Sequence, residues 1–183
     1  MSTKQRPKQQ RGEVTAELLL DAALRVYAAE GEQGFTVNAV TKASGVSLGS
    51  LYHHFGSLDG LLSALAQRWL DRLLEELATA LAGSRTARTG IRAIVRTYLA
   101  FVRDHRDAAR LLPQEARLPA FAHWIQPRIE AGELAPLPLP LVESLVLGPV
   151  IGVARRSLSG VDDVDLDEAA RLLPDRIWRS LSP

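Results

Sequence analysis

The chain has 183 residues, a formal net charge of +1 and no cysteine. Its length suits one compact domain, or a small domain carried on a larger one. The lack of cysteine excludes disulfides, thiolate zinc sites and cysteine nucleophiles, and it fits a reducing compartment. The N-terminus is charged, and no later stretch offers about 18 uninterrupted apolar residues. We therefore expect a cytoplasmic protein with no membrane partner.

The near-zero net charge conceals an uneven distribution in the first third of the chain. No acidic residue lies between Glu32 and Asp59. Four basic residues also precede the first acidic one, and these are Lys4, Arg6, Lys8 and Arg11. Both segments can approach a phosphate backbone without repulsion from their own acidic side chains. We expect residues 1–12 to form a basic, flexible arm.

The first helix is predicted from apolar residues at helical spacing between Leu20 and Tyr27. Thr15 is placed to cap its N-terminus, and Glu17 lies in the first turn, where the helix dipole favours an acid. Gly31 is expected to end it.

Two short helices follow, at residues 37–44 and 48–54. Thr36 and Ser47 are placed as their N-caps, each with apolar residues spaced as a hydrophobic staple. Gly45 supplies the permissive backbone that a tight turn between them needs. Two short helices joined by such a turn form a helix-turn-helix, whose second helix enters the major groove of DNA. Spacing alone is a weak signal, because many helical hairpins bind nothing.

The remainder of the chain also has helical periodicity. Ser57 is expected to cap a long fourth helix that ends at Gly83. Further helices are predicted at about residues 86–104, 106–112, 119–131, 141–158 and 165–181, with a proline-rich hinge at 135–140. Pro149 and Pro174 fall inside the last two patterns and are expected to kink or interrupt them.

The surface of the 48–54 helix favours contact with nucleic acid. Leu51 and Phe55 are expected to pack inward, while Gly49 and Ser50 leave room for close approach to bases. Tyr52 offers a hydroxyl to a phosphate. Because this helix has no Lys or Arg, charge must come from elsewhere, and the candidates are Lys8, Arg11 and Lys42.

Two stretches of the sequence, AALRVYAAEG and GFTVNAVTKASGVSLGSLYHHFGSLDGLL, resemble the N-terminal region of the TetR/AcrR family of bacterial transcriptional regulators. The resemblance covers roughly the first third of the chain without a gap. It implies an all-α fold of about nine helices, with a three-helix helix-turn-helix DNA-binding head at 13–56 and a helical effector-binding and dimerisation body at 57–183. The last two thirds match in helical architecture alone.

The resemblance also implies roles for individual residues of the head. Phosphate contacts fall on Thr36, Ser47, Tyr52 and His53, and base-edge contacts on Leu48, Gly49 and Ser50. One position departs from the family pattern: Leu58 stands where a phosphate-binding Lys is usual.

The body is expected to hold an effector pocket and a dimer interface. Each aromatic residue there is more often core than ligand contact, but the family body plan favours a largely apolar pocket. Its candidate residues are Trp69, Tyr98, Phe101, His105, Phe121, Trp124 and Arg128. A helix-turn-helix that binds two half-sites calls for a two-fold homodimer, which the family builds from its last two helices. The candidate interface residues are Leu145, Ile151, Leu173 and Ile177.

Together these features predict a transcriptional regulator, a repressor by the family's default, that leaves its double-stranded operator when an unidentified small molecule binds. An alternative is a small-molecule receptor or carrier with a degenerate head, which Leu58 alone supports. An enzyme is disfavoured, since no paired nucleophile and base is evident. His53 and His54 point about 100° apart on a helix, so no metal site is expected, and no cofactor is expected either.

Overall fold

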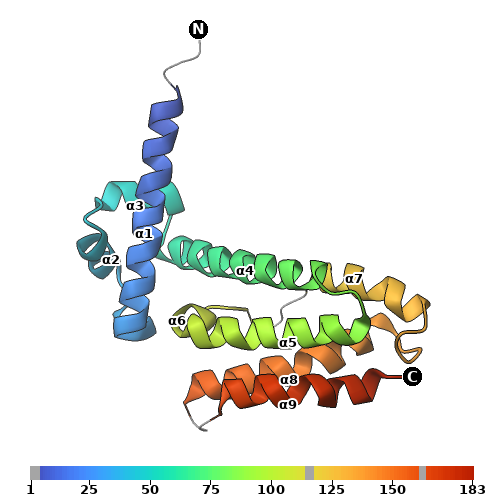
Figure 1. Cartoon of the computed structure of the whole chain (residues 1–183). Helices are drawn as coiled ribbons and strands as arrows, with labels where there is room; N and C mark the ends of the chain where they lie inside the picture. Colours follow the sequence, from blue (N-terminus) through green and yellow to red (C-terminus); the bar gives the residue numbers. More distant parts are fainter. Residues whose placement is uncertain (1–4, 114–117, 161–163) are drawn as a thin grey trace. The chain divides into compact units, whose positions relative to one another are not determined.

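The computed structural model describes residues 5–113, 118–160 and 164–183, with side chains from residue 11 onward. These residues form an all-helical fold, as predicted (Figure 1). Their nine helices are α1 (Gln5–Gly34), α2 (Val37–Ser44), α3 (Leu48–Phe55), α4 (Leu58–Ala82), α5 (Ala87–Asp104), α6 (Arg106–Ala109), α7 (Pro119–Glu130), α8 (Leu139–Ser159) and α9 (Leu166–Leu181).

Helix α1 begins ten residues before the expected cap at Thr15. Its first turns are rich in Gln, Arg and Lys, which are good helix formers, and Pro7 falls in the first turn, where its missing N–H costs no hydrogen bond. Thr15 is therefore inside the helix, and its hydroxyl donates to the Arg11 carbonyl at 2.8 Å. The predicted end is confirmed, because Gly31 (φ 67°, ψ −167°) breaks the helical backbone.

Other boundaries also differ from the predicted ones. Helix α6 is a single turn that ends at Ala109, short of the predicted 112. Helix α8 starts at Leu139, inside the predicted hinge, with Pro140 in its first turn. Pro149 and Pro174 do not interrupt α8 and α9, which each continue through the proline as one helix.

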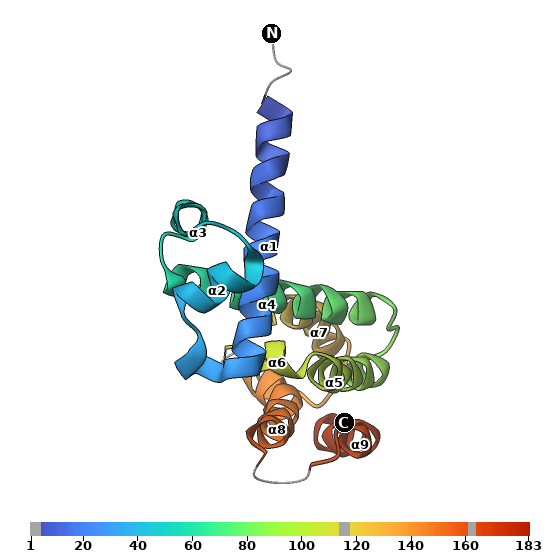
Figure 2. The ribbon, with the colours of Figure 1, turned by 90° about the vertical axis from the view of Figure 1, so that its left-hand side faces the viewer.

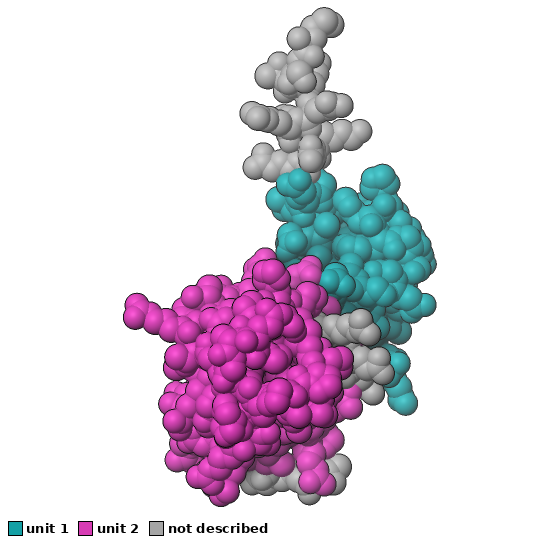
Figure 3. Space-filling model, turned by 90° about the vertical axis from the view of Figure 1, so that its right-hand side faces the viewer, with its two compact units in different colours: residues 1–69 teal, residues 70–183 magenta. Residues whose placement is uncertain are grey.

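The chain forms two compact units, coloured separately in Figure 3: an N-terminal unit of residues 1–69 and a C-terminal unit of residues 70–183. The N-terminal unit has its own core, in which α1, α2, α3 and the first half of α4 bury apolar side chains. The most deeply buried are Leu19, Ala22, Ala23, Val40, Leu51, Leu61 and Leu65. The unit extends past residue 56 because Leu61 and Leu65 of α4 belong to this core.

Helix α5 is central to the C-terminal unit. It packs against α8 and α9, which also pack against each other, as Figure 2 shows. Its buried face includes Ile91, Ile94 and Leu99, and α8 contributes Val146 and Val150. Across the ranges that the structure describes, no helix combines the length and the apolar character needed to cross a bilayer.

Candidate nucleic-acid interface and body sites

A side-chain cap and a glycine define the two ends of α2. The Thr36 hydroxyl accepts a hydrogen bond from the Ala39 N–H at 3.2 Å, as predicted for an N-cap. At the other end Gly45 has a φ of 69°, a conformation that favours glycine, and its N–H donates to the Thr41 carbonyl at 3.0 Å. The chain therefore turns sharply after α2, and α3 begins three residues after Gly45, at Leu48.

Ser47 caps α3 and also contacts Ser50. Its Oγ accepts from the Ser50 N–H at 3.2 Å and lies 3.0 Å from the Ser50 Oγ. A hydroxyl has one donor and two acceptor sites, so capping leaves hydrogen-bonding capacity for an outside partner. The two serines predicted to contact DNA are thus held together at the start of the helix.

The exposed face of α3 carries the residues predicted to contact bases and phosphates. Leu48 and Tyr52 are 51% and 48% exposed, although both are large and apolar enough to favour burial. Gly49 is also exposed, and a Cβ added there meets nothing within 4 Å. Leu51, by contrast, is fully buried, and Phe55 is half-buried. The helix therefore presents an uncharged face with room for close approach.

The remaining predicted head residues fall at different places on this unit. His53 is exposed, while His54 is half-buried and approaches Gly12 of α1. Arg11 on α1 and Lys42 in the last turn of α2 are exposed. Lys8 lies in α1, but its side chain is outside the described residues. Leu58, the departure from the family pattern, is half-buried at the first position of α4.

The corner between α3 and α4 depends on a glycine that the sequence reasoning missed. Ser57 caps α4 as predicted, and its Oγ accepts from the Gly60 N–H at 2.9 Å. A Cβ at Gly60 would lie 2.1 Å from the backbone oxygen of Phe55, the last residue of α3. Only a glycine allows the two helices to meet so closely. A glycine in the first turn of a long helix was the available signal.

The seven predicted pocket residues do not form one cluster. Phe101 and His105 are in contact, with ring centroids 4.8 Å apart, at the C-terminal end of α5. The guanidinium of Arg128 stacks on Trp124 at 3.6 Å, and the Trp124 ring lies against Gly90. Gly90 and Phe101 are about 16 Å apart along α5 at 1.5 Å per residue. The two pairs therefore lie near opposite ends of that helix.

The other three pocket candidates are located as follows. Phe121 is fully buried on α7, and Tyr98 is buried on α5. Burial raises the pKa of the Tyr98 hydroxyl, and the nearby positive charge of Arg155 offsets part of this rise. Trp69 is half-buried on α4 and is the last residue of the N-terminal unit.

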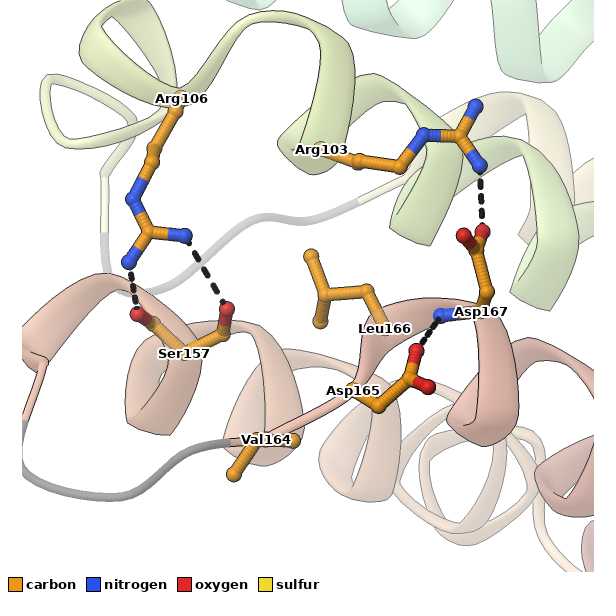
Figure 4. A pocket seen from close by; sticks show the side chains of 7 residues that line it. All are labelled: Arg103, Arg106, Ser157, Val164, Asp165, Leu166 and Asp167. Atoms are coloured by element: carbon orange, nitrogen blue, oxygen red, sulfur yellow. Dashed lines mark hydrogen bonds and ion pairs between the residues drawn. The ribbon is translucent and has the colours of Figure 1, made fainter.

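A cavity of about 220 Å³ lies in the C-terminal unit (Figure 4), and none of the seven pocket candidates lines it. Its charged groups are already engaged. Arg103 pairs with Asp167, and Arg106 donates to the hydroxyl and the carbonyl oxygen of Ser157. Asp165 accepts from backbone N–H groups at the start of α9. This cavity is polar, unlike the apolar pocket expected from the sequence.

The four candidate interface residues differ in exposure. Leu145, Ile151 and Leu173 are half-buried, whereas Ile177 is only 4% exposed. Ile177 is thus part of the protomer's own core, and its side chain is not available to a partner. Leu141 and Leu172, which were not among the candidates, are 45% and 55% exposed on α8 and α9.

The match to a known protein family lies within the N-terminal unit. The model of the bacterial regulatory proteins of the tetR family matches residues 19–65. The chain is 28% identical over 161 residues to the HTH-type transcriptional repressor KstR2 of Rhodococcus jostii strain RHA1, covering 87% of this chain and 74% of that protein. It is also 32% identical over 83 residues to the HTH-type transcriptional regulator BetI of Rhizobium meliloti strain 1021, covering 45% of this chain and 41% of BetI.

Two solved structures extend the likeness over almost the whole chain. A TetR-like transcriptional regulator from Rhodococcus sp. RHA1 has 28% identity and a TM-score of 0.67, covering 91% of this chain and 95% of that one. FadR of Bacillus subtilis, solved in complex with stearoyl-CoA, has a TM-score of 0.75, covering 88% and 96%. At 16% identity, the FadR match shows a shared fold alone.

A capped helix-turn-helix with an exposed second helix, followed by a helical body, defines a DNA-binding transcriptional regulator. The family model and the regulators named above agree with this class. Residues 19–65 thus match the DNA-binding domain of the tetR family of bacterial regulatory proteins, and the chain as a whole is similar to TetR-like transcriptional regulators.

Proposed function

We propose that the protein is a homodimeric repressor that binds a pseudo-palindromic operator and leaves it when a small molecule binds its C-terminal unit. The observation that carries this proposal is the exposed face of α3, where Leu48, Gly49 and Tyr52 are open to solvent next to the capping hydroxyl of Ser47. No acidic residue lies between Glu32 and Asp59 to repel phosphate. Arg11 and Lys42 are exposed cations of the same unit.

Direct measurement of DNA binding tests the proposal. Fluorescence anisotropy with duplexes selected by the protein from a random-sequence library, at low and high salt, is expected to show sequence-preferring binding that falls steeply with salt. Failure to enrich any sequence would favour the receptor or carrier instead. We do not favour that alternative, because its support was Leu58, and a half-buried leucine at the start of α4 is compatible with ordinary packing.

The proposed dimer uses the outer face of α8 and α9. Leu141, Leu145 and Gly152 recur on one side of α8 with at least partial exposure, and Leu172 is exposed on α9. Two half-sites about 34–36 Å apart give a dimer a large gain in affinity over a monomer. This face is apolar enough to favour self-association.

Substitution of this face tests the dimer. We expect Leu141→Arg combined with Leu172→Arg to give a folded monomer whose operator affinity is lower by about tenfold or more. Gln126→Arg on the exposed side of α7 introduces the same type of charge and serves as the control. Analytical ultracentrifugation measures the outcome, and a double variant that remains dimeric would rule out this interface.

The proposed effector is largely apolar and acts by a population shift. It lowers operator affinity only to the extent that it prefers the conformation that binds DNA less well, so tight binding alone is insufficient. Tyr98, Phe101 and Phe121 provide aromatic surface inside the C-terminal unit. FadR of Bacillus subtilis, with the same fold, binds stearoyl-CoA, which supports an apolar ligand class. Helix α4 belongs to both units and is the element proposed to carry the change.

A further inference from the structure

Arg68 of α4 bridges two carboxylates of α1, and we call these three residues the Arg68 bridge. One Nη donates to Glu17 Oε2 and the other to Asp21 Oδ1, each at 2.8 Å. Glu17 and Asp21 are four residues apart and so lie on one face of α1. The Arg68 side chain is largely covered, while both carboxylates are more than half exposed. A forked guanidinium suits this double contact, whereas a lysine ammonium is a point charge.

The bridge joins elements that are distant in sequence, since Arg68 is 51 and 47 residues from its two partners. Helix α1 in turn contacts α2, because Arg25 Nη2 donates to the Ala43 carbonyl at 3.3 Å. Ala43 lies in the last turn of α2, where the helix dipole favours a cation. Only Gly56 and Ser57 separate α3 from α4. The helix-turn-helix therefore contacts α1 beside its turn, at Ala43, and leads into α4 at its C-terminal end, and Arg68 links α1 to α4.

Arg72, one turn further along α4, provides a contrast. It pairs with Glu76 of the same helix at 3.4 Å. A pair within one helix supports that helix but does not fix it against another. The pair of Arg72 with Glu76 lies within one helix, whereas the Arg68 bridge joins two helices.

We propose that Arg68 is a positioning residue for operator binding, which sets the orientation of α1 against α4 and thereby the orientation of α3 toward the groove. This role rests on the proposed operator binding. It also predicts an effect opposite to simple electrostatics. Removing two carboxylates from a DNA-binding unit should strengthen attraction to phosphate, yet loss of the bridge should weaken binding to the correct sequence.

The test measures the dissociation constant for the selected operator duplex and for a random-sequence duplex. The variants are Arg68→Met, Glu17→Gln with Asp21→Asn, and the control Arg72→Met, all checked for folding by circular dichroism. A further variant exchanges the charges, with Arg68→Glu, Glu17→Arg and Asp21→Arg. We expect the first two variants to lose about threefold to tenfold in the ratio of operator to random affinity. The control is expected to keep the wild-type ratio.

Each outcome bears on the proposal. Recovery of the ratio in the charge-exchange variant supports a positioning role, because a bridge of reversed sign restores the geometry. Tighter operator binding by the Glu17→Gln, Asp21→Asn variant, with an unchanged ratio, would overturn it. Equal losses in Arg68→Met and Arg72→Met would also overturn it, since they would reflect lost charge alone. A wild-type protein that binds no DNA sequence would instead overturn the proposed function.

Discussion

The two units of the chain use charge differently. In the C-terminal unit ion pairs connect helices: Asp175 of α9 accepts from Arg88 and Arg92 of α5, and Asp167 pairs with Arg103. In the N-terminal unit the Arg68 bridge joins α4 to α1, but residues 33–58, which include α2 and α3, contain no acidic residue. A cross-helix network suits a body that keeps its own helices together, and an acid-free face suits a unit that binds a polyanion.

This contrast separates residues that hold a unit together from residues that meet a partner. Leu51 and Tyr52 are neighbours on α3, yet one is fully buried and the other is half exposed. Substitutions at buried positions of the N-terminal unit should therefore unfold it, while substitutions on the exposed face should change binding alone.

The largest expected effect comes from the core of the N-terminal unit. Leu51→Ala leaves a cavity where a fully buried side chain was and should destabilise the unit by about 2–5 kcal/mol. We expect loss of operator binding and an early partial loss of helical circular dichroism, while size-exclusion chromatography still shows a dimer. A single transition of the whole chain, shifted as one, would contradict the independence of the two cores.

A smaller effect is expected from a glycine in each unit. Gly60→Ala places a Cβ 2.1 Å from the Phe55 backbone oxygen, which cannot move without shifting α3. Gly90→Ala meets the far end of the Trp124 ring at 2.0 Å, which is a side chain and not backbone. We expect a cost of about 1–3 kcal/mol for Gly60→Ala with reduced operator affinity, and a lesser cost for Gly90→Ala with normal affinity. Urea unfolding and anisotropy would measure both, and reversed rankings would contradict the account.

The smallest effect concerns acid stability of the C-terminal unit. Backbone N–H groups of Glu168 and Asp167 hold the pKa of the Asp165 carboxyl below its usual range. A carboxyl with a lowered folded pKa stabilises the fold above its unfolded pKa, and this contribution is lost as pH falls through the folded value. Asp165→Asn keeps a capping oxygen but does not titrate. Urea unfolding below about pH 4 should then depend less on pH than in the wild type; an unchanged slope would argue against this cap.

Much of the fold could be predicted because local chemistry determines it. Thr36, Gly45 and Ser47 set the ends of α2 and the start of α3 through hydrogen bonds to residues at most four positions away. Such contacts depend on short spacings that the sequence displays directly. The family resemblance then identified α3 as the helix expected to contact DNA.

The parts that could not be predicted depend on contacts between distant residues. Ile177 and Leu172 of α9 are both large and apolar, so the sequence does not distinguish them. Packing against other helices buries Ile177 and leaves Leu172 exposed. The Arg68 bridge joins residues about 50 positions apart in sequence, and nothing local marks it. Trp124 of α7 lies against Gly90 of α5 and not near Phe101, and this placement depends on how the two helices pack, which periodicity does not reveal.

The most direct test of α3 as the DNA-contacting element is Gly49→Ala. A Cβ at Gly49 meets nothing within 4 Å in the free protein, and alanine favours helix by about 0.5 kcal/mol, so thermal stability should be unchanged or slightly higher. If Gly49 faces base edges, the added methyl group obstructs close approach, and operator affinity should fall by about tenfold with little change for a random duplex. An alanine variant that binds the operator as tightly as the wild type would contradict the account.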